Sequence, residues 1–267
     1  MEYLYDHWDR IKYNLAAKKI IIFLDYDGTL TPIAKTPAQA NLSPKVRTVL
    51  IRLSSIDDCT VAIISGRSLE DVREKVGINY LTYAGNHGFE IDSGFKAPHV
   101  YFLPYTLRQV LDLVYIKLVR QFFLREGVFV ENKNFSLSVH YRLAKKKDIT
   151  EIKKIIAEVC SPYQKSRDIK VSKGKKVMEI KPFLDWDKGK AVLWVLRRIK
   201  ASLKEENVQS IYIGDDKTDE DAFTALKNKG LTIRVGKSEQ STAEFYLKSV
   251  KEVHRLLRHI VGIKESR

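Results

Sequence analysis

The stretch FLDYDGTLTPI, residues 23–33, ends an apolar run with two aspartates, Asp25 and Asp27, followed at once by a glycine. Residues two apart in a strand project to the same side, so both carboxylates are expected to reach one crevice just beyond the strand. Two anions that close together require a cation or a shared proton. The alternative is a pair of turn-forming aspartates before Gly28, without a chemical role.

Five short apolar runs end in this way, in glycine or polar residues: 20–24, 61–64, 81–84, 211–213 and 231–235. Such runs are typical of buried parallel strands that lead into active-site loops. Amphipathic helical segments lie between them, at residues 43–54, 68–76 and 188–204. The pattern predicts an α/β fold with a doubly wound parallel sheet, and ligands bind such sheets at the carboxyl ends of the strands.

The middle of the chain has a different pattern. Helical patterns at 106–126 and 149–160 are each followed by two expected strands, at 128–131 and 135–142, and at 169–172 and 177–181. This order, αββαββ, indicates an inserted α+β domain with antiparallel pairing. We predict a core made of residues 1–104 and 183–267, and an inserted cap domain at 105–182.

One expected strand of this insertion, residues 135–142, alternates between apolar and polar side chains. Ser136, Ser138, His140 and Arg142 occupy every second position. Successive side chains of a strand point to opposite faces, so the apolar face should pack while the polar face meets solvent or a ligand.

The length and composition predict a soluble, unexported protein. Its 267 residues are 44% hydrophobic, which is enough for one large domain with an insertion. The two cysteines, Cys59 and Cys160, are far apart and fit no metal-binding pattern, so no disulfide or zinc site is expected. No apolar run resembles a signal peptide or a membrane span, and we expect a cytoplasmic protein without a membrane partner.

The net charge is +14, from 47 Lys and Arg against 33 Asp and Glu. The basic residues are spread along the chain, and no zinc finger or aromatic-rich RNA-binding motif accompanies them. This favours solvated surfaces over a nucleic-acid partner, although an anionic small substrate also suits the charge. A basic nucleic-acid-binding protein with an inactive core is the alternative from a different functional class.

A third carboxylate would complete a metal site with the first two. Asp215 follows another expected strand and is the obvious candidate. Carboxylate oxygens are the ligands of hard divalent ions, most simply Mg²⁺. Gly28 would let backbone N–H groups cradle phosphate oxygens. These parts suggest phosphoryl transfer, in which one aspartate attacks phosphorus and the other moves the proton.

The motifs resemble those of a known superfamily. DYDGT resembles the DxDGT signature of haloacid dehalogenase phosphatases, and Ser65, Lys188 and Gly214-Asp215-Asp216 match its later motifs in order. The blocks IISGRS, AGNHGFEI, VENKNFSLSVHYR, VMEIKP, DKGKAV and GDDKTDEDAF are similar to those of trehalose-6-phosphate phosphatases, from residue 20 to 236. Lys181 departs from the pattern, since arginine is common there. The resemblance implies a Rossmann-like core with an α/β cap inserted between the second and third motifs.

The resemblance also implies roles for the motif residues. Asp25 would be the nucleophile and a Mg²⁺ ligand, while Asp27 would be the general acid and base and offer the ion its carbonyl oxygen. Asp215 would bind Mg²⁺ directly. The residues expected to orient waters on the ion are Asp216 and Asp219. Their neighbours Glu220 and Asp221 also begin an expected helix, where acidic residues suit the dipole in any case, so neither is given a site role.

By the same resemblance, the remaining expected site residues would bind the substrate. Ser65 and Lys188 would hold the phosphoryl oxygens, although Ser65 could instead cap a helix and Lys188 could be ordinary surface lysine. Further phosphate contacts are expected from Gly28, Gly66 and Arg67. The residues expected at the sugar are Asn86, His87, Glu131, Lys133, His140, Arg142 and Glu179.

The function that the resemblance implies is hydrolysis of trehalose 6-phosphate through an aspartyl phosphate, with Mg²⁺ as cofactor and a small sugar phosphate as substrate. The same chemistry on sucrose 6-phosphate or a mannosyl-3-phosphoglycerate is the alternative, because specificity depends on a handful of contacts. We expect a monomer.

Overall fold

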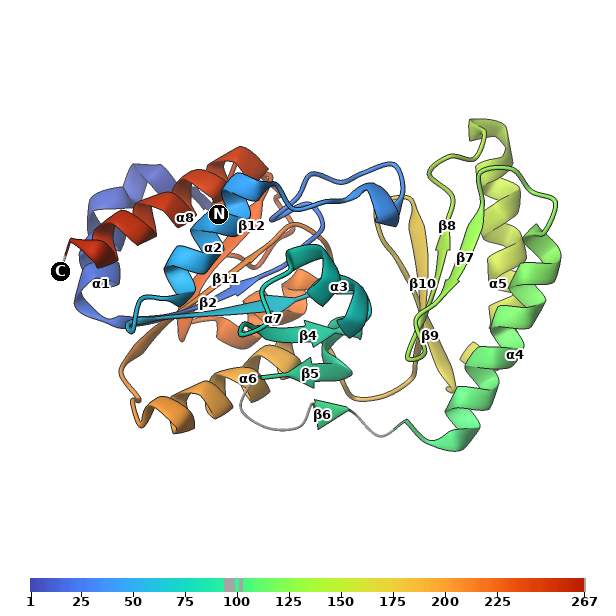
Figure 1. Ribbon diagram of the computed structural model, residues 1–267. Coiled ribbons are helices and arrows are strands. Elements are labelled where there is room, and N and C mark those ends of the chain that lie inside the picture. The colour runs from blue at the N-terminus through green and yellow to red at the C-terminus, as the bar shows by residue number, and fades with distance from the viewer. Residues whose placement is uncertain (94–98, 101–102, 267) are drawn as a thin grey trace. The chain divides into compact units, whose positions relative to one another are not determined.

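The computed structural model describes residues 1–93, 99–100 and 103–266 (Figure 1). The chain forms two compact units. The core unit contains Met1–Val100 and Trp186–Arg267, and the inserted unit contains Tyr101–Asp185.

Within the described residues, the core unit has one sheet of nine strands, in the order β1-β13-β12-β11-β2-β3-β4-β5-β6. Neighbours from β1 to β4 are parallel, whereas β5 and β6 are added antiparallel at one edge. In sheet order, the strands are Glu2–Tyr3, Phe245–Leu247, Gly230–Val235, Val208–Gly214, Lys19–Leu24, Cys59–Ile64, Thr82–Gly85, Glu90–Asp92 and His99–Val100.

Helices cover both faces of this sheet. Ile20 and Ile22 of β2 pack on the face that α1, α2, α3 and α8 cover, and Ile21 and Phe23 pack on the face that α6 and α7 cover. Figure 1 shows α1, α2 and α8 on one side of the sheet and α6 on the other. These helices are α1 (Trp8–Ala17), α2 (Pro44–Ser54), α3 (Leu69–Val76), α8 (Val250–Glu265), α6 (Lys188–Leu203) and α7 (Asp219–Leu226). The predicted doubly wound parallel sheet is confirmed.

The predicted strands of the core are all present, as β2, β3, β4, β11 and β12. The sequence did not predict β1, β5, β6, β13, α1 or α8. The four strands are only two or three residues long, too short for an apolar run to signal them. Helix α8 could have been found, because its buried residues recur at helical spacing from Val253 to Val261.

Side-chain caps fix the starts of the helices that border the site. Ser68 caps α3 by accepting a hydrogen bond from the N–H of Asp71 at 3.3 Å, and Asp187 caps α6 by accepting from the N–H of Lys190 at 2.8 Å. Each cap satisfies an N–H group that the helix itself leaves unpaired. Ser65 is therefore not the cap of α3, which was its alternative role.

The inserted unit has the predicted order αββαββ. Its helices are α4, Tyr105–Phe122, and α5, Ile149–Lys165, and its strands β7 to β10 are Phe129–Asn132, Leu137–His140, Ile169–Lys173 and Val177–Pro182. The sheet order is β7-β8-β10-β9, and every neighbouring pair is antiparallel.

Short 3₁₀ helices also occur in both units, at Leu4–His7, Pro37–Gln39, Asn86–Gly88 and Lys146–Asp148.

The expectation of an open polar face along residues 135–142 was wrong for the two serines. Ser136 and Ser138 are each only 1% exposed, whereas His140 is half-buried and Arg142 is exposed. Strand β8 lies inside the sheet, and the residues paired with Ser138 are Glu131 and Glu179. Their longer side chains flank the short serine, which explains its burial.

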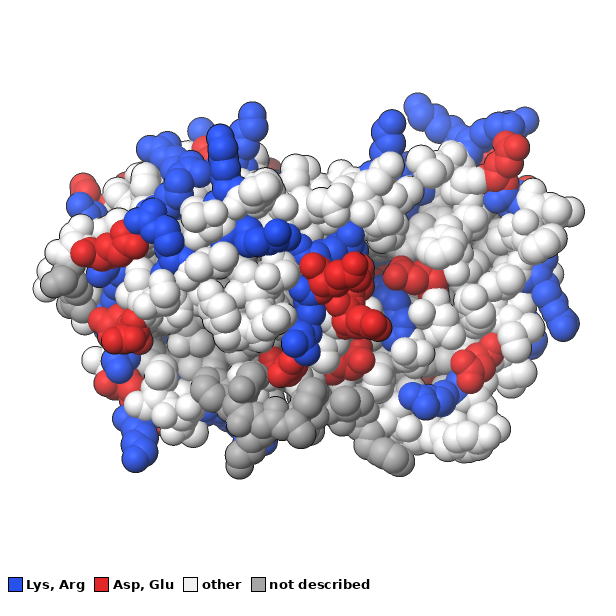
Figure 2. Space-filling model, viewed as in Figure 1, with Lys and Arg blue, Asp and Glu red and all other residues white. Residues whose placement is uncertain are grey.

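On the face drawn in Figure 2, Lys and Arg prevail along the upper edge, and several Asp and Glu lie lower on the same face. Among the described residues, none of the helices combines the length and the apolar character needed to cross a membrane.

Candidate active site

Asp25 lies immediately after β2, at the carboxyl edge of the core sheet. Its N–H donates to the carbonyl oxygen of Ile213 on β11 at 2.9 Å, which extends the pairing of the two strands by one residue. The side chain is buried. Because β2 and β11 are neighbours, their carboxyl ends bring Asp25 close to the Gly-Asp-Asp segment at 214–216.

Lys188, the first residue of α6, reaches the same place. Its Nζ lies 2.8 Å from Oδ1 of Asp25 and 2.8 Å from Oδ1 of Asp219. Lys188 is 2% exposed and Asp219 is fully buried. The alternative of an ordinary surface lysine is therefore wrong. One ammonium group joins two carboxylates that come from opposite ends of the sequence.

Burial and mutual charge decide how these groups ionise. Burial raises the pKa of Asp25 well above its usual range, although Lys188 lowers it. Burial alone would lower the pKa of Lys188, but the carboxylates of Asp219 and Asp25 hold it well above its ordinary value. For Asp219, burial opposes ionisation, yet Lys188 and its hydrogen bonds leave its pKa below the usual value. Lys188 and Asp219 thus form an ion pair, and Asp25 needs further positive charge to ionise fully.

Two glycines let the acidic residues approach the backbone. A Cβ on Gly28 would lie 2.0 Å from Oδ2 of Asp215, so the Asp215 carboxylate sits directly over this glycine. A Cβ on Gly214 would lie 2.3 Å from Cγ of Asp219. Any larger residue at either position would displace a carboxylate from the site.

Both carboxylate oxygens of Asp219 are engaged. Oδ1 accepts from Lys188 and from the hydroxyl of Tyr212 at 2.7 Å. Oδ2 accepts from the N–H groups of Asp215 and Asp216 at 2.9 and 2.8 Å. Asp219 is thereby suited to orienting the segment at 214–216 rather than to binding a ligand of its own.

The cluster has the composition of a divalent cation site. Single oxygens of Asp25, Asp215 and Asp219 all lie within 4.8 Å of one another. With Lys188, these four buried groups carry a formal charge of −2, from three carboxylates and one ammonium. An oxygen-rich buried site with excess negative charge fits a hard divalent ion. Since Asp219 is already engaged, Asp25 and Asp215 are the residues that could bind it.

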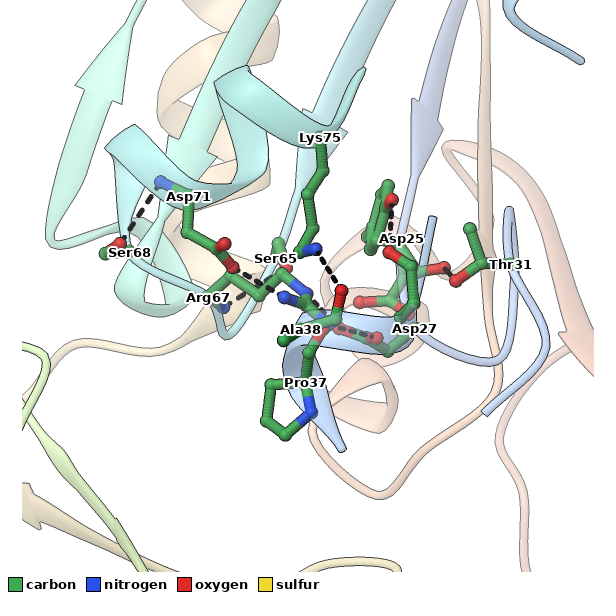
Figure 3. A network of polar contacts seen from close by, with 12 residues as sticks. Asp25, Asp27, Thr31, Pro37, Ala38, Ser65, Arg67, Ser68, Asp71 and Lys75 are labelled. Carbon is green, nitrogen blue, oxygen red and sulfur yellow. Dashed lines mark hydrogen bonds and ion pairs between the residues drawn. The ribbon is translucent and has the colours of Figure 1, made fainter. Parts of the chain in front are cut away.

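Asp27 has a different partner. Its carboxylate accepts two parallel hydrogen bonds from Arg67, from Nε to Oδ2 at 2.6 Å and from Nη2 to Oδ1 at 2.8 Å (Figure 3). Arg67 also bonds Asp71 at 2.5 Å and the carbonyl oxygen of Pro37 at 2.9 Å, and its guanidinium lies over the ring of Tyr26. Arg67 was expected at the phosphate, but in this arrangement its side chain holds Asp27.

Burial by itself would lower the pKa of Arg67, but hydrogen bonds and charge from Asp27 and Asp71 raise it above its already high value. Its cationic form is thus fixed beside Asp27. The Asp27 side chain keeps 39% of its surface exposed, so it remains open to a substrate on its other side.

Ser65, Gly66, Asn86 and His87 lie together. The N–H of His87 donates to the carbonyl oxygen of Ser65 at 2.9 Å, and the N–H of Asn86 donates to that of Arg67 at 2.6 Å. The His87 ring packs on Gly66, where a Cβ would lie 2.7 Å from Cε1. Asn86 and His87 both have positive φ, 49° and 58°, which is uncommon for residues with side chains. Such strain persists only where surrounding contacts impose it.

In the inserted unit, the expected sugar-binding residues form pairs among themselves. His140 Nε2 lies 2.8 Å from Oε2 of Glu131. Lys133 Nζ lies 3.4 Å from Glu179, which also pairs with Lys181 at 2.9 Å. Arg142 behaves differently, because it is exposed and donates to the carbonyl oxygen of Lys175.

A family model described as trehalose-phosphatase matches residues 23–252, which is most of the chain. The chain belongs to the trehalose-phosphatase family. It is 35% identical to probable trehalose-phosphate phosphatase H of Arabidopsis thaliana, over 98% of this chain and 77% of the relative. It is also 35% identical to trehalose-phosphate phosphatase B of the same plant, over 96% and 70%.

Solved structures agree with this assignment at the level of fold. The C-terminal domain of trehalose-6-phosphate phosphatase from Candida albicans superposes with a TM-score of 0.81 at 24% identity, over 95% of this chain and 96% of that one. The resemblance that the motifs indicated is confirmed, and the protein is an enzyme of a phosphatase family.

One residue that contacts this candidate site was not predicted from the sequence. Tyr212 is fully buried on β11 and donates its hydroxyl hydrogen to Asp219. The signal was present, because a tyrosine between two isoleucines in a buried strand needs a partner for its hydroxyl group. The next segment, Gly-Asp-Asp, could have indicated where that partner lies.

Gly28→Ala should lower phosphatase activity at least about tenfold, because the new Cβ displaces the Asp215 carboxylate. Gly236→Ala is the matched control. Gly236 has a φ of +86°, close to the +88° of Gly28, but a Cβ there would meet nothing within 4 Å. Backbone strain should cost each variant about 1–2 kcal/mol of stability, measured by thermal unfolding, and Gly28→Ala should lose more because it also displaces a buried carboxylate. Equal losses of activity would contradict the role of Gly28.

Proposed function

We propose that the protein hydrolyses trehalose 6-phosphate to trehalose and inorganic phosphate, with Mg²⁺ as cofactor. The observation that carries the proposal is the buried group in which Lys188 joins Asp25 to Asp219 beside Asp215. Family membership supports the substrate class. The buried charges support phosphoryl transfer, because an anionic phosphate needs cations beside an anionic nucleophile.

In the first half-reaction, a carboxylate oxygen of Asp25 forms a bond to phosphorus while the bond from phosphorus to the sugar oxygen breaks. Asp27 gives a proton to that oxygen, so the disaccharide leaves as a neutral alcohol. Lys188 balances charge on Asp25 and on the phosphoryl oxygens. The Ser65 hydroxyl offers a hydrogen bond to the same oxygens. The N–H of Gly28, which the sequence suggested for this role, instead donates to the carbonyl oxygen of Thr31 at 2.7 Å.

In the second half-reaction, water attacks phosphorus of the aspartyl phosphate. Asp27 takes a proton from the water as the bond between phosphorus and Asp25 breaks, which restores the Asp25 carboxylate and releases phosphate. Protonation makes one carboxyl oxygen of Asp27 a weaker acceptor. The hydrogen bond from the Arg67 fork to that oxygen is therefore weaker while Asp27 holds a proton.

Mg²⁺ bound by Asp25, Asp215 and the carbonyl oxygen of Asp27 would supply positive charge, which eases the approach of an anionic carboxylate to an anionic phosphate. Asp219 keeps Asp215 in place through its hydrogen bonds to the 215 and 216 N–H groups. Asp216 is half-buried beside them and would orient water on the ion.

The inserted unit supplies groups suited to a sugar. Glu131 with His140, and Lys133 with Glu179, present acceptors beside donors. Sugar hydroxyls both donate and accept, so such pairs match them. We propose that these residues, with Asn86 and His87 of the core unit and with Arg142, recognise the disaccharide. The matching of hydroxyl positions would decide between trehalose 6-phosphate and other sugar phosphates.

Asp25→Asn should lower kcat for trehalose 6-phosphate by about 10³-fold or more while the fold persists, because the amide is a poor nucleophile of the same shape. The measurement is phosphate release, with circular dichroism and thermal unfolding as checks on folding. Ile51→Ala, at an exposed position of α2, is a control that should leave phosphate release unchanged. Normal turnover in a folded Asp25→Asn protein would exclude Asp25 as the nucleophile.

A substrate series should separate the candidate sugars. Phosphate release with Mg²⁺ should be fastest from trehalose 6-phosphate, with kcat/KM at least about 10²-fold above sucrose 6-phosphate and mannosyl-3-phosphoglycerate, because mismatched hydroxyls leave buried polar groups unpaired. Removal of the ion with a chelator should abolish release from every substrate. A higher kcat/KM for another sugar phosphate would change the assigned substrate but leave the chemistry intact.

Arg67→Met should lower kcat/KM by an amount that depends on the leaving group of the substrate. Loss of the guanidinium frees Asp27, so kcat/KM for trehalose 6-phosphate should fall about 10²-fold, the contribution of a positioned general acid. For p-nitrophenyl phosphate it should change less than about threefold, because a good leaving group needs no acid. If Arg67 instead binds phosphate, as its place in the sequence first indicated, both substrates should suffer equally.

A further inference from the structure

Arg234 contacts the segment that carries Asp215. It lies on β12, directly paired with Gly214 at the end of β11. Its Nη2 donates to the carbonyl oxygen of Asp215 at 2.9 Å, and its Nη1 lies 3.5 Å from the carbonyl oxygen of Asp216. The strand order of the sheet therefore brings a guanidinium against the backbone at 215–216.

Asp219 holds the N–H groups of the same two residues. Its Oδ2 accepts from the N–H groups of Asp215 and Asp216. Residues 215–216 thus have their two N–H groups on a buried carboxylate and their carbonyl groups on a guanidinium. Hydrogen bonds to both the N–H and the carbonyl groups restrict rotation of this backbone segment. The direction of the Asp215 side chain is fixed by the backbone that carries it.

Glu220, next to Asp219 on α7, fixes Arg234 in turn. Its Oε1 lies 2.6 Å from Nη1 of Arg234. Its Oε2 accepts from the N–H and the hydroxyl group of Thr242, at 2.8 and 3.0 Å. The Arg234 and Glu220 side chains are only 16% and 23% exposed, so solvent screens their attraction less than that of a surface pair.

We propose that Arg234 and Glu220 act as a positioning pair, which fixes the backbone at 215–216 so that Asp215 is directed at the divalent cation. The proposal rests on the proposed function, because it assigns the ion to Asp25 and Asp215. Both members of the pair act through the backbone that carries Asp215 rather than on the reacting groups. Partners that orient metal ligands commonly contribute about 10- to 100-fold in metal affinity.

Charge alone makes the opposite forecast for Arg234. A guanidinium close to the site repels a cation, so its removal would tighten metal binding if only charge mattered. Removal of the Glu220 charge would then weaken metal binding. Positioning predicts that both substitutions weaken binding, and that their effects are not additive because they disrupt one unit. The direction of the change therefore separates the two explanations.

The test is titration of the full chain with Mn²⁺ in the absence of substrate. Binding is measured by calorimetry or by the electron paramagnetic resonance signal of the free ion. We expect the Mn²⁺ dissociation constant to rise about tenfold in Arg234→Leu. Glu220→Gln should raise it less, and the double variant no more than Arg234→Leu alone. The Mn²⁺ dissociation constant of Arg234→Lys should lie between those of the wild type and Arg234→Leu. A lysine keeps the charge, but it lacks the planar guanidinium that bonds two carbonyl groups and Glu220 at once.

Arg52→Leu is the matched control. It removes the same charge from another pair, Arg52 with Glu265, which joins α2 to α8. Its Mn²⁺ dissociation constant should equal that of the wild type. At saturating Mg²⁺, Arg234→Leu should regain kcat on trehalose 6-phosphate, because excess ion compensates for a poorly directed ligand.

Unchanged or tighter Mn²⁺ binding in Arg234→Leu would overturn the proposal, and so would opposite signs for Arg234→Leu and Glu220→Gln. If Arg234→Leu does not fold, weaker binding in both Glu220→Gln and Arg234→Lys supports positioning, and unchanged binding in both overturns it. Failure of the wild type to bind Mn²⁺ would instead remove the metal from the proposed function, and this inference with it. Normal wild-type binding with unaffected variants would remove this inference alone.

Discussion

The candidate site depends on the burial of Lys188 with Asp25, Asp215 and Asp219 at the carboxyl edge of the core sheet. Each group would cost free energy if buried alone, so each needs the others close by. Glycine at 28, 189 and 214 permits this closeness. A Cβ on Gly189 would lie 2.3 Å from the carbonyl oxygen of Asp221, so a larger residue would push α6, which carries Lys188, away from α7, which carries Asp219.

Sequence patterns predicted which strand ends carry the residues of this cluster, but not how the side chains pair with one another. The strand ends were predictable, because apolar runs followed by Gly or Asp mark the edge of a parallel sheet. Strand alternation was the reason for expecting both carboxylates in one crevice, yet β2 ends at Leu24 and the chain turns at Gly28, where φ is +88°. The two side chains therefore have different partners. Asp25 joins the buried cluster, and Asp27 pairs with Arg67.

The partners of the arginines could not be predicted from local sequence. Arg67 follows a strand end, which suggested a phosphate contact, but three segments meet there and place Asp27, Asp71 and a backbone carbonyl around its guanidinium. Arg234 stands in a run typical of a buried strand, and only the adjacency of β11 and β12 gives it a role. Local patterns identify strands, whereas contacts between them depend on strand order, which a single sequence specifies weakly.

The buried charges also argue for chemistry over stability. Replacing a buried ion pair by well-packed apolar side chains is often neutral or stabilising, so charge at the centre of a fold is weak support for a structural role. Here the burial of Asp25 raises its pKa, which opposes the ionised form that a nucleophile needs. A cation beside Asp25 and Asp215 would reverse that effect. Burial makes these carboxylates costly to ionise without a cation. It therefore favours the binding of a divalent ion together with a phosphate substrate.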